Sequence, residues 1–345
     1  MKLSYLAAAL ACVCATALVA PAGAAATPTT DRADAAAGWL ARQLVDGDHF
    51  EVDFGGTSFP DAGLTIDGIL AFASAGASTT AGGNATTWLA RPANLSGYIG
   101  DGTTESYAGA TAKASLAAQV RGLNPATFGG VDLPARLRAL LTPSGRFSDH
   151  SDFGDFSNAL TQSLAIITLR RTAGGAPASA VAFAAGTQCP DGGFPMSFDV
   201  TPCASDTDAT AMVTQALLAT GRIAKAEQGL TWLASKQQAT GGLSFGDGAA
   251  TVVPNTNTTG LAGQAFRAGG RLLAAHKAKT FVLGLQVGCD GPVENRGAIA
   301  YDVAGYDQNT VVRATAQAVL ALGGPGLAKL TASGAKPQAF ELACA

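Results

Sequence analysis

Asp206 and Asp208 are the two carboxylates of this sequence whose spacing best suits chemistry at a pocket mouth. They precede a stretch from Ala209 to Thr220 that contains no ionised residue. As a pair they could face a cation. The competing interpretation is helix N-capping, in which an aspartate accepts hydrogen bonds from the free N–H groups of the first turn. We favour capping, because Asp155 and Asn257 stand at the place of Asp208 in the repeated segments described below.

A second series of acidic residues falls in the polar loops of the chain. If these loops gather at one rim, their carboxylates would form a negative collar able to hold a cation or a basic ligand. The alternative, which we favour, is that each aspartate bonds to the backbone of its own turn. The series is Asp53, Asp101, Asp149, Asp199, Asp247 and Asp302.

The densest polar cluster runs from Phe147 to Asn158 and contains Asp149, His150, Asp152 and Asp155. Its oxygen-rich spacing makes calcium an alternative here, although the Glu and Gly of an EF-hand loop are absent. We predict no metal and no other cofactor. Two arginines in turn regions, Arg146 and Arg296, are the basic residues that a polysaccharide lyase would need.

Other catalytic signatures are missing from the 345 residues. There are three histidines, and we find no G-x-S-x-G, H-E-x-x-H, phosphate-binding glycine loop or dinucleotide fingerprint. The formal net charge of −3 supplies no basic field for nucleic acid or an anionic membrane. We therefore expect no nucleic-acid partner. After the N-terminal apolar run there is no second one of about 20 residues, so we also expect no membrane span.

Residues 1–26 have the pattern of a secretory signal peptide, with Lys2, an apolar run and small residues at the cleavage region. Lipidation at Cys12 or Cys14 is the alternative. The predicted mature chain keeps four cysteines, an even number in an oxidising compartment. We predict the disulfides Cys189–Cys203 and Cys289–Cys344, because no C-x-x-C spacing or nearby histidine supports a zinc site.

A bulky residue recurs about every 49 residues, each time followed by a glycine turn, a polar loop and a second helical segment. The first helix carries charge on one face in most units, although that of the fourth unit has none, whereas the second helix is nearly free of charge. A helix that is apolar all round needs neighbours all round. We expect an all-α fold, an (α/α)6 toroid of six helix hairpins, in a single domain over 27–345. The series is Trp39, Trp88, Leu137, Phe183, Trp232 and Phe281.

The segment Gln188-Cys189-Pro190-Asp191-Gly192-Gly193-Phe194 resembles the Q-x-x-D-G-G-F core of the prenyltransferase and squalene-oxidase repeat, the unit of the α/α toroid superfamily. Looser copies begin at Gln238 and Gln286. The resemblance implies an α/α toroid. Among its members, the terpenoid cyclases use a D-x-D-D acid, which Asp206-Thr207-Asp208-Ala209 approaches with Ala in the last position.

The zinc ligands of prenyltransferases and the Cys-Gly-Glu-Gln of thioester domains are absent. The helices of this sequence resemble most closely those of the cobalamin-carrier toroids, which are not catalytic. We therefore favour a secreted, non-catalytic module that binds a small apolar molecule or an extracellular protein. The alternative is a toroid-class enzyme, either terpenoid cyclase-like or prenyltransferase-like, or a polysaccharide lyase.

Overall fold

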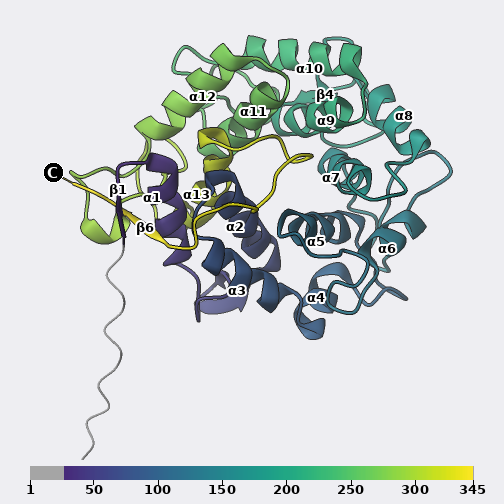
Figure 1. The fold of residues 1–345 in the computed structure, drawn as a ribbon. Helices are drawn as coiled ribbons and strands as arrows, with labels where there is room; N and C mark the ends of the chain where they lie inside the picture. Colours follow the sequence, from purple (N-terminus) through teal and green to yellow (C-terminus); the bar gives the residue numbers. More distant parts are fainter. Residues whose placement is uncertain (1–26, 345) are drawn as a thin grey trace, which may run out of the picture.

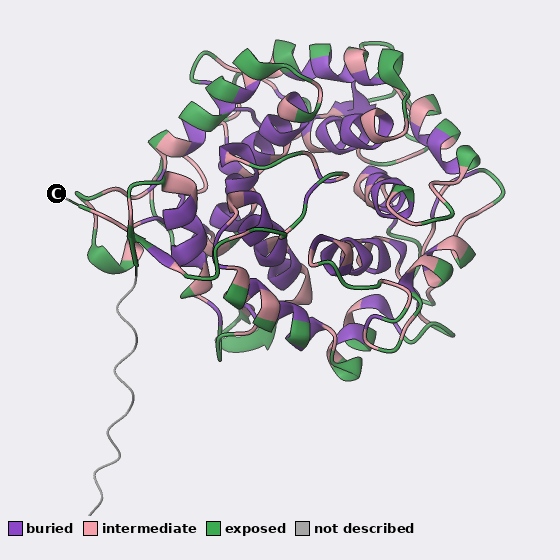
Figure 2. Cartoon of the chain, viewed as in Figure 1, coloured by how far each residue is buried: buried purple, intermediate pink, exposed green. Residues whose placement is uncertain are grey.

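The computed structural model describes residues 27–344, and its centre is a ring of inner helices (Figure 1). Each inner helix contacts the next, and α13 contacts α2, so the ring is closed. Figure 2 shows that these helices are buried along most of their surface, as expected for helices with few ionised residues. The inner helices are α2 (Ala62–Ala75), α5 (Ala108–Val120), α7 (Ala159–Arg170), α9 (Thr207–Ala219), α11 (Thr256–Ala268) and α13 (Val311–Leu322).

A second layer of helices surrounds the ring, and these helices expose one face to solvent (Figure 2). They are α1 (Arg32–Ala41), α3 (Thr79–Leu89), α4 (Pro92–Ile99), α6 (Leu133–Ala139), α8 (Ala178–Gly186), α10 (Ile223–Lys236) and α12 (Leu272–Gly284). Every bulky residue of the 49-residue series lies in one of these outer helices. All of them are buried except Phe183, which is half-buried, so they serve as packing residues between the layers.

In three units, a glutamine that precedes the glycine turn binds the next outer helix. In each case the Nε2 atom donates to a backbone carbonyl within that helix. The pairs are Gln188 with Lys225 (3.0 Å), Gln237 with Ala274 (2.9 Å) and Gln286 with Arg32 (2.8 Å). The third pair connects the last turn to the first outer helix and thereby repeats the same contact across the point of closure.

Glycines allow close approach where helices meet. A Cβ atom at Gly260 of α11 would collide with the backbone oxygen of Gln317 in α13. Similarly, a Cβ atom at Gly38 of α1 would collide with the backbone of Phe340. The absence of a side chain at these two positions therefore lets neighbouring elements pack closely.

The C-terminal segment 323–338 crosses the end of the ring at which the inner helices end (Figure 1). Arg171 donates to the carbonyls of Leu327 (2.7 Å) and Leu330 (2.9 Å), and the backbone N–H of Leu327 donates to Gln215 Oε1 at 3.1 Å. Strand β6 (Phe340–Leu342) then pairs in parallel with β1 (Thr27–Thr29). The two ends of the described chain are therefore held together beside α1.

Both expected disulfides are present, and each joins Cα atoms 5.6 Å apart. Cys189–Cys203 closes the loop before α9, and Cys289–Cys344 holds the C-terminal strand. In residues 27–344, no helix combines the length and the apolar character needed to cross a membrane. The expected signal peptide and the lipidation alternative lie outside the described residues.

The second unit departs from the expected helix–turn–helix order. The glycine turn expected at Ser96 is wrong, because Ser96 lies inside α4, which begins with Pro92 in its first turn. The chain turns instead at Gly100, whose φ of 83° suits glycine.

Two other units contain short antiparallel strands. A hairpin of β2 (Glu51–Phe54) and β3 (Thr57–Pro60) precedes α2, and a two-residue ladder joins β4 (Phe194–Pro195) to β5 (Ser205–Asp206).

Candidate functional site

Six loops, here called the mouth loops, lead from an outer helix to the next inner helix and surround the ring where the inner helices begin. The first backbone N–H of an inner helix often donates to the following mouth loop. Ala159 donates to Met196 (2.9 Å), Thr207 to Gly246 (2.7 Å) and Thr256 to Tyr301 (2.8 Å). These bonds fix neighbouring loops to one another. The mouth loops are 42–61, 100–107, 140–158, 187–206, 237–255 and 285–310.

The N-caps of three consecutive inner helices agree only in part with those expected. Asp206 caps α9 by accepting from the backbone N–H of Ala209 at 2.8 Å, as expected. Asp208, however, lies inside the first turn of α9 and is not the cap. The corresponding caps are Asn158 on α7 and Asn255 on α11, so the capping roles inferred from Asp155 and Asn257 are wrong. Asp208 thus lacks the structural explanation that the repeat suggested.

The carboxyl group of Asp208 is largely withdrawn from water, and its Oδ1 atom is buried without a hydrogen-bond partner. Burial raises its pKa from the ordinary 3.8 to about 6, against the lowering effect of a hydrogen bond with Thr258. The nearby carboxylate of Asp206 raises it further. Thr258 is itself oriented by Asn255, whose Nδ2 donates to its hydroxyl at 3.2 Å. Asp208 is therefore a buried acid that holds its proton up to mildly acidic pH.

In the neighbouring helix α11, an asparagine occupies the position equivalent to that of Asp208. Asn257 stands 49 residues after Asp208, also in the first turn of an inner helix, and its Oδ1 atom is likewise buried without a partner. One turn deeper lie Met212 on α9 and Leu261 on α11. Tyr301 is close enough for the charge of Asp208 to raise the pKa of its phenol, although burial contributes more. The acid is thus surrounded by acceptors, a phenol and apolar side chains.

Across the ring from α9, the inner wall carries an ion pair. Lys113 Nζ of α5 lies 2.6 Å from Asp67 Oδ1 of α2 and donates to the carbonyl of Gly63 at 3.0 Å. Burial lowers the pKa of Lys113, but the charges of Asp67 and Tyr98 and the hydrogen bond with Asp67 together raise it more, so the net shift of the pKa is upward. Gln317 of α13 donates to Asp67 Oδ2 at 3.2 Å. This cluster is internally neutral and bonded within the wall.

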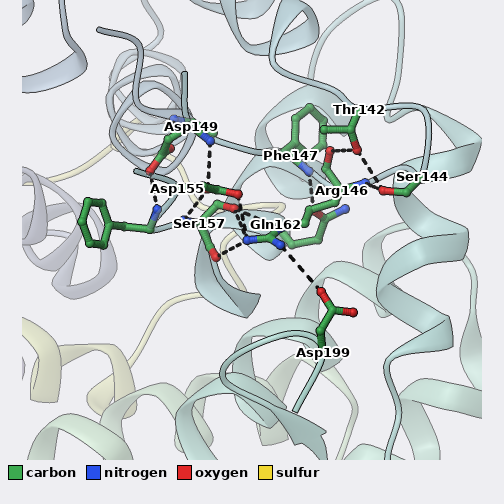
Figure 3. A network of polar contacts seen from close by, with 11 residues as sticks. Thr142, Ser144, Arg146, Phe147, Asp149, Asp155, Ser157, Gln162 and Asp199 are labelled. Carbon is green, nitrogen blue, oxygen red and sulfur yellow. Dashed lines mark hydrogen bonds and ion pairs between the residues drawn. The ribbon is translucent and has the colours of Figure 1, made fainter. Parts of the chain in front are cut away.

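The polar cluster around Arg146 is a bonded network rather than an open site (Figure 3). Arg146 forms an ion pair with Asp155 at 2.9 Å, donates to the Ser157 carbonyl at 3.1 Å and lies over the ring of Phe198. Asp199, exposed on the facing loop, is 3.9 Å away. A lyase would need a free arginine, and the bonds of Arg146 are already taken by this chain.

Asp155 and Asp149 extend the same network into the backbone (Figure 3). Asp155 Oδ1 accepts from the N–H groups of Asp149 (3.0 Å) and Ser157 (2.9 Å). Partial desolvation raises the pKa of Asp155, but the hydrogen bond with the Ser157 side chain, these two backbone bonds and Arg146 together lower it. Asp149 accepts from the N–H of Ala108 at 2.7 Å, at the start of α5. Burial nevertheless raises the pKa of Asp149. Asp152 is exposed beside them.

Most of the remaining loop acids bond to their own turns, as favoured from the sequence. Each accepts a backbone N–H a few residues further on. The pairs are Asp53 with Gly56, Asp101 with Thr104, Asp247 with Ala249 and Asp302 with Ala304. Arg296 similarly donates to the carbonyls of Gly291 (3.2 Å) and Cys289 (2.9 Å). Within residues 27–344, no three His, Cys, Asp or Glu side chains are grouped to hold a metal.

Charge is strongly polarised between the mouth loops and the rest of the ring. The mouth loops contain 18 of the 25 acidic residues but three of the 22 lysines and arginines, a formal net charge of −15. The rest of residues 27–344 has 18 basic and seven acidic residues, a net charge of +11. The small overall charge therefore conceals a strongly negative mouth, which was visible in the sequence only as one aspartate per loop.

No family model and no curated protein matches the chain. Among solved structures, it is similar to a type II terpene cyclase, MstE from Scytonema, with a TM-score of 0.62 and 14% identity over 84% of this chain and 96% of that one. It is similar also to an unsaturated glucuronyl hydrolase specific for heparin, with a TM-score of 0.62 and 13% identity over 85% and 95% of the two chains.

A protein from Actinoplanes matches with a TM-score of 0.52 and 17% identity over 85% of this chain and 98% of that one. The cyclase and the hydrolase are both α/α toroids. At these identities the likeness concerns the fold. The chain therefore has the α/α toroid fold expected from the repeat, but the outer layer of residues 27–344 has seven helices, not the six of the expected hairpins.

Proposed function

We propose that this chain is a secreted toroid enzyme that protonates a carbon–carbon double bond of a neutral, apolar terpenoid, with Asp208 as the general acid. The observation that carries the proposal is the buried carboxyl of Asp208, whose pKa of about 6 keeps it protonated in mildly acidic solution. A proton donor needs a pKa near the working pH and a site sheltered from water. Both similar enzymes named above share the α/α toroid fold of this chain.

The charge of the mouth favours a neutral substrate. A net charge of −15 around the entrance disfavours prenyl diphosphates, which a prenyltransferase would bind. The same charge disfavours polyuronates, the substrates of a pectate-type lyase, and Arg146 and Arg296 are both engaged by their own loops. Of the alternatives stated from the sequence, the cyclase-like one therefore fits best.

The proton balance of this reaction is simple. Asp208 transfers its proton to the terminal double bond, forming a C–H bond and leaving a carbocation on the substrate. The next double bond attacks that cation and closes a ring, and a proton lost from carbon at the end regenerates an alkene. The product is an isomer of the substrate, and solvent returns a proton to Asp208. Ala209 replaces the last carboxylate of the D-x-D-D pattern, so Asp206 is the one acid next to Asp208 in this segment.

The experiment is incubation of the mature chain with geranylgeraniol at several pH values, followed by gas chromatography and mass spectrometry. We expect a product of unchanged mass and a shorter retention time than the linear substrate. The rate of product formation should fall as the pH rises through about 6. Asp208→Asn should lower the rate by about 100-fold or more. The matched control is Asp247→Asn, an exposed mouth-loop aspartate bonded to its own turn, and it should leave the rate unchanged.

A charged substrate supplies the second comparison. Geranylgeranyl dihydroxybenzoate, the substrate named for the Scytonema cyclase, carries a carboxylate and should react more slowly here than the neutral alcohol. If no alkene isomerises, and native mass spectrometry instead finds a small molecule bound equally to the native chain and to Asp208→Asn, the proposal is wrong. The non-catalytic binding module predicted from the sequence would then be the better description.

A further inference from the structure

Exposed aromatic side chains are concentrated at the mouth of the ring. All five exposed phenylalanines of residues 27–344 lie in mouth loops, and Tyr306 accompanies them. They are between 41% and 78% exposed and come from four different loops. We call this set the aromatic crown: Phe54, Phe59, Phe153, Phe156, Phe245 and Tyr306.

The crown residues lie at one end of the ring, because the mouth loops are bonded side by side. The loop before α9 accepts from the start of α7, and the loop before α11 accepts from the start of α9. The loop before α13 accepts from the start of α11, and Arg313 of α13 pairs with Asp61 of the first mouth loop at 2.7 Å. Exposed apolar residues gathered on one face of a soluble protein usually mark an interaction surface.

The negative charge of the mouth loops indicates which kind of partner the crown would bind. The mouth loops carry a net charge of −15, so a second copy of this face and an anionic lipid surface would both be repelled. Aromatic side chains need an apolar counterpart, and carboxylates need cations. We propose that the crown is a docking surface for a basic polypeptide segment with apolar side chains, such as a cationic amphipathic helix.

This inference is independent of the proton transfer proposed for Asp208, because it rests on the exposed aromatic side chains and on the charge of the mouth loops.

The test measures binding of labelled synthetic peptides to the mature chain by fluorescence anisotropy. The probe is a leucine–lysine amphipathic helix of about 18 residues, or about five turns. One comparison peptide replaces lysine with glutamate, and another replaces leucine with serine. We expect the leucine–lysine peptide to bind at least about tenfold more tightly than either, and its affinity to fall as salt is raised.

Matched double variants locate the surface. Phe153→Ser with Phe156→Ser should weaken peptide binding by about tenfold or more. Leu272→Ser with Leu273→Ser, two residues equally exposed at the opposite end of the ring, should leave it unchanged. Circular dichroism melting confirms that both variants fold. Asp208→Asn should bind the peptide at least as well as the native chain, which separates this test from that of the catalytic proposal.

Four results would overturn the inference. Equal binding of the serine–lysine peptide would show a surface that responds to charge alone, and equal binding of the glutamate peptide would show one that ignores charge. Sedimentation of the chain with phosphatidylcholine vesicles, abolished by the Phe153 and Phe156 changes, would assign the crown to lipid. Self-association lost in the same variant would assign it to a second copy.

Discussion

Replacing Asp208 by asparagine should stabilise the protein, because the native carboxyl resists ionisation in its buried position. The pKa of Asp208 is about 6 in the folded chain and 3.8 when unperturbed. At about 1.4 kcal/mol for each pKa unit, the ionised carboxylate costs about 3 kcal/mol of folding free energy. Asparagine has the same shape, cannot ionise, and can still interact with Thr258.

The sign of the pH dependence follows from the raised pKa. Below pH 3.8 Asp208 is protonated in both folded and unfolded chains, so it costs nothing. As the pH rises from 3.8 to about 6, the unfolded chain releases the proton while the folded chain keeps it, and stability falls. Above about pH 6 the cost is constant. The advantage of Asp208→Asn should therefore be near zero at pH 4 and about 3 kcal/mol at pH 7.5.

Urea unfolding of both chains, followed by far-ultraviolet circular dichroism at pH 4 and pH 7.5, measures this difference. Asp247→Asn removes an exposed mouth-loop carboxylate and is the control, with little expected change beyond the loss of one turn bond. An equal advantage for Asp208→Asn at both pH values, or none at pH 7.5, would refute a raised pKa. The general-acid assignment would lose its main support in that case.

Three further changes test the ring itself by thermal or urea unfolding. Lys113→Met should cost about 3 kcal/mol by leaving Asp67 unpaired, and adding Asp67→Leu should restore much of that loss; unchanged stability in the single variant would deny the ion pair. Gly260→Ala should cost about 1–3 kcal/mol by forcing α11 away from α13, so a neutral result would contradict their close contact. Replacing Cys289 and Cys344 by serine should cost about 2–4 kcal/mol, and an unaltered melting temperature would show that this bond contributes nothing.

The repeated layout of the chain was predictable because it depends on local and periodic features. The 49-residue series placed Trp39 and Trp232 correctly in outer helices, and the even cysteine number predicted both disulfides. Helix α4 was missed, since its Ser96-Gly97 pair reads as a turn and the helix depends on Pro92 at its start. The C-terminal segment across the ring was also missed, because its bonds join residues far apart in sequence.

The site was harder to predict because its chemistry depends on three-dimensional neighbours. Asp206 and Asp208 look alike in sequence, but a difference of two positions makes the first a helix cap and the second a buried acid. Thr258 forms a hydrogen bond with Asp208, and the pKa of Tyr301 is raised by the charge of Asp208. These two residues come from the next two units of the chain. One signal was available: Asn158, Asp206 and Asn255 recur at steps of 48 and 49 residues, and that register identifies the true caps.

The negative mouth exceeds what the fold itself requires. The inner helices all begin at the mouth, and each N-terminus is equivalent to about half a positive charge, so six of them account for about three carboxylates. Asp61, Asp149 and Asp206 already bond to the backbone at such helix starts. Most of the remaining acids of the mouth loops repel one another without neutralising a helix. Because that repulsion destabilises the free protein, the surplus charge is best explained by a cationic group that binds there from outside.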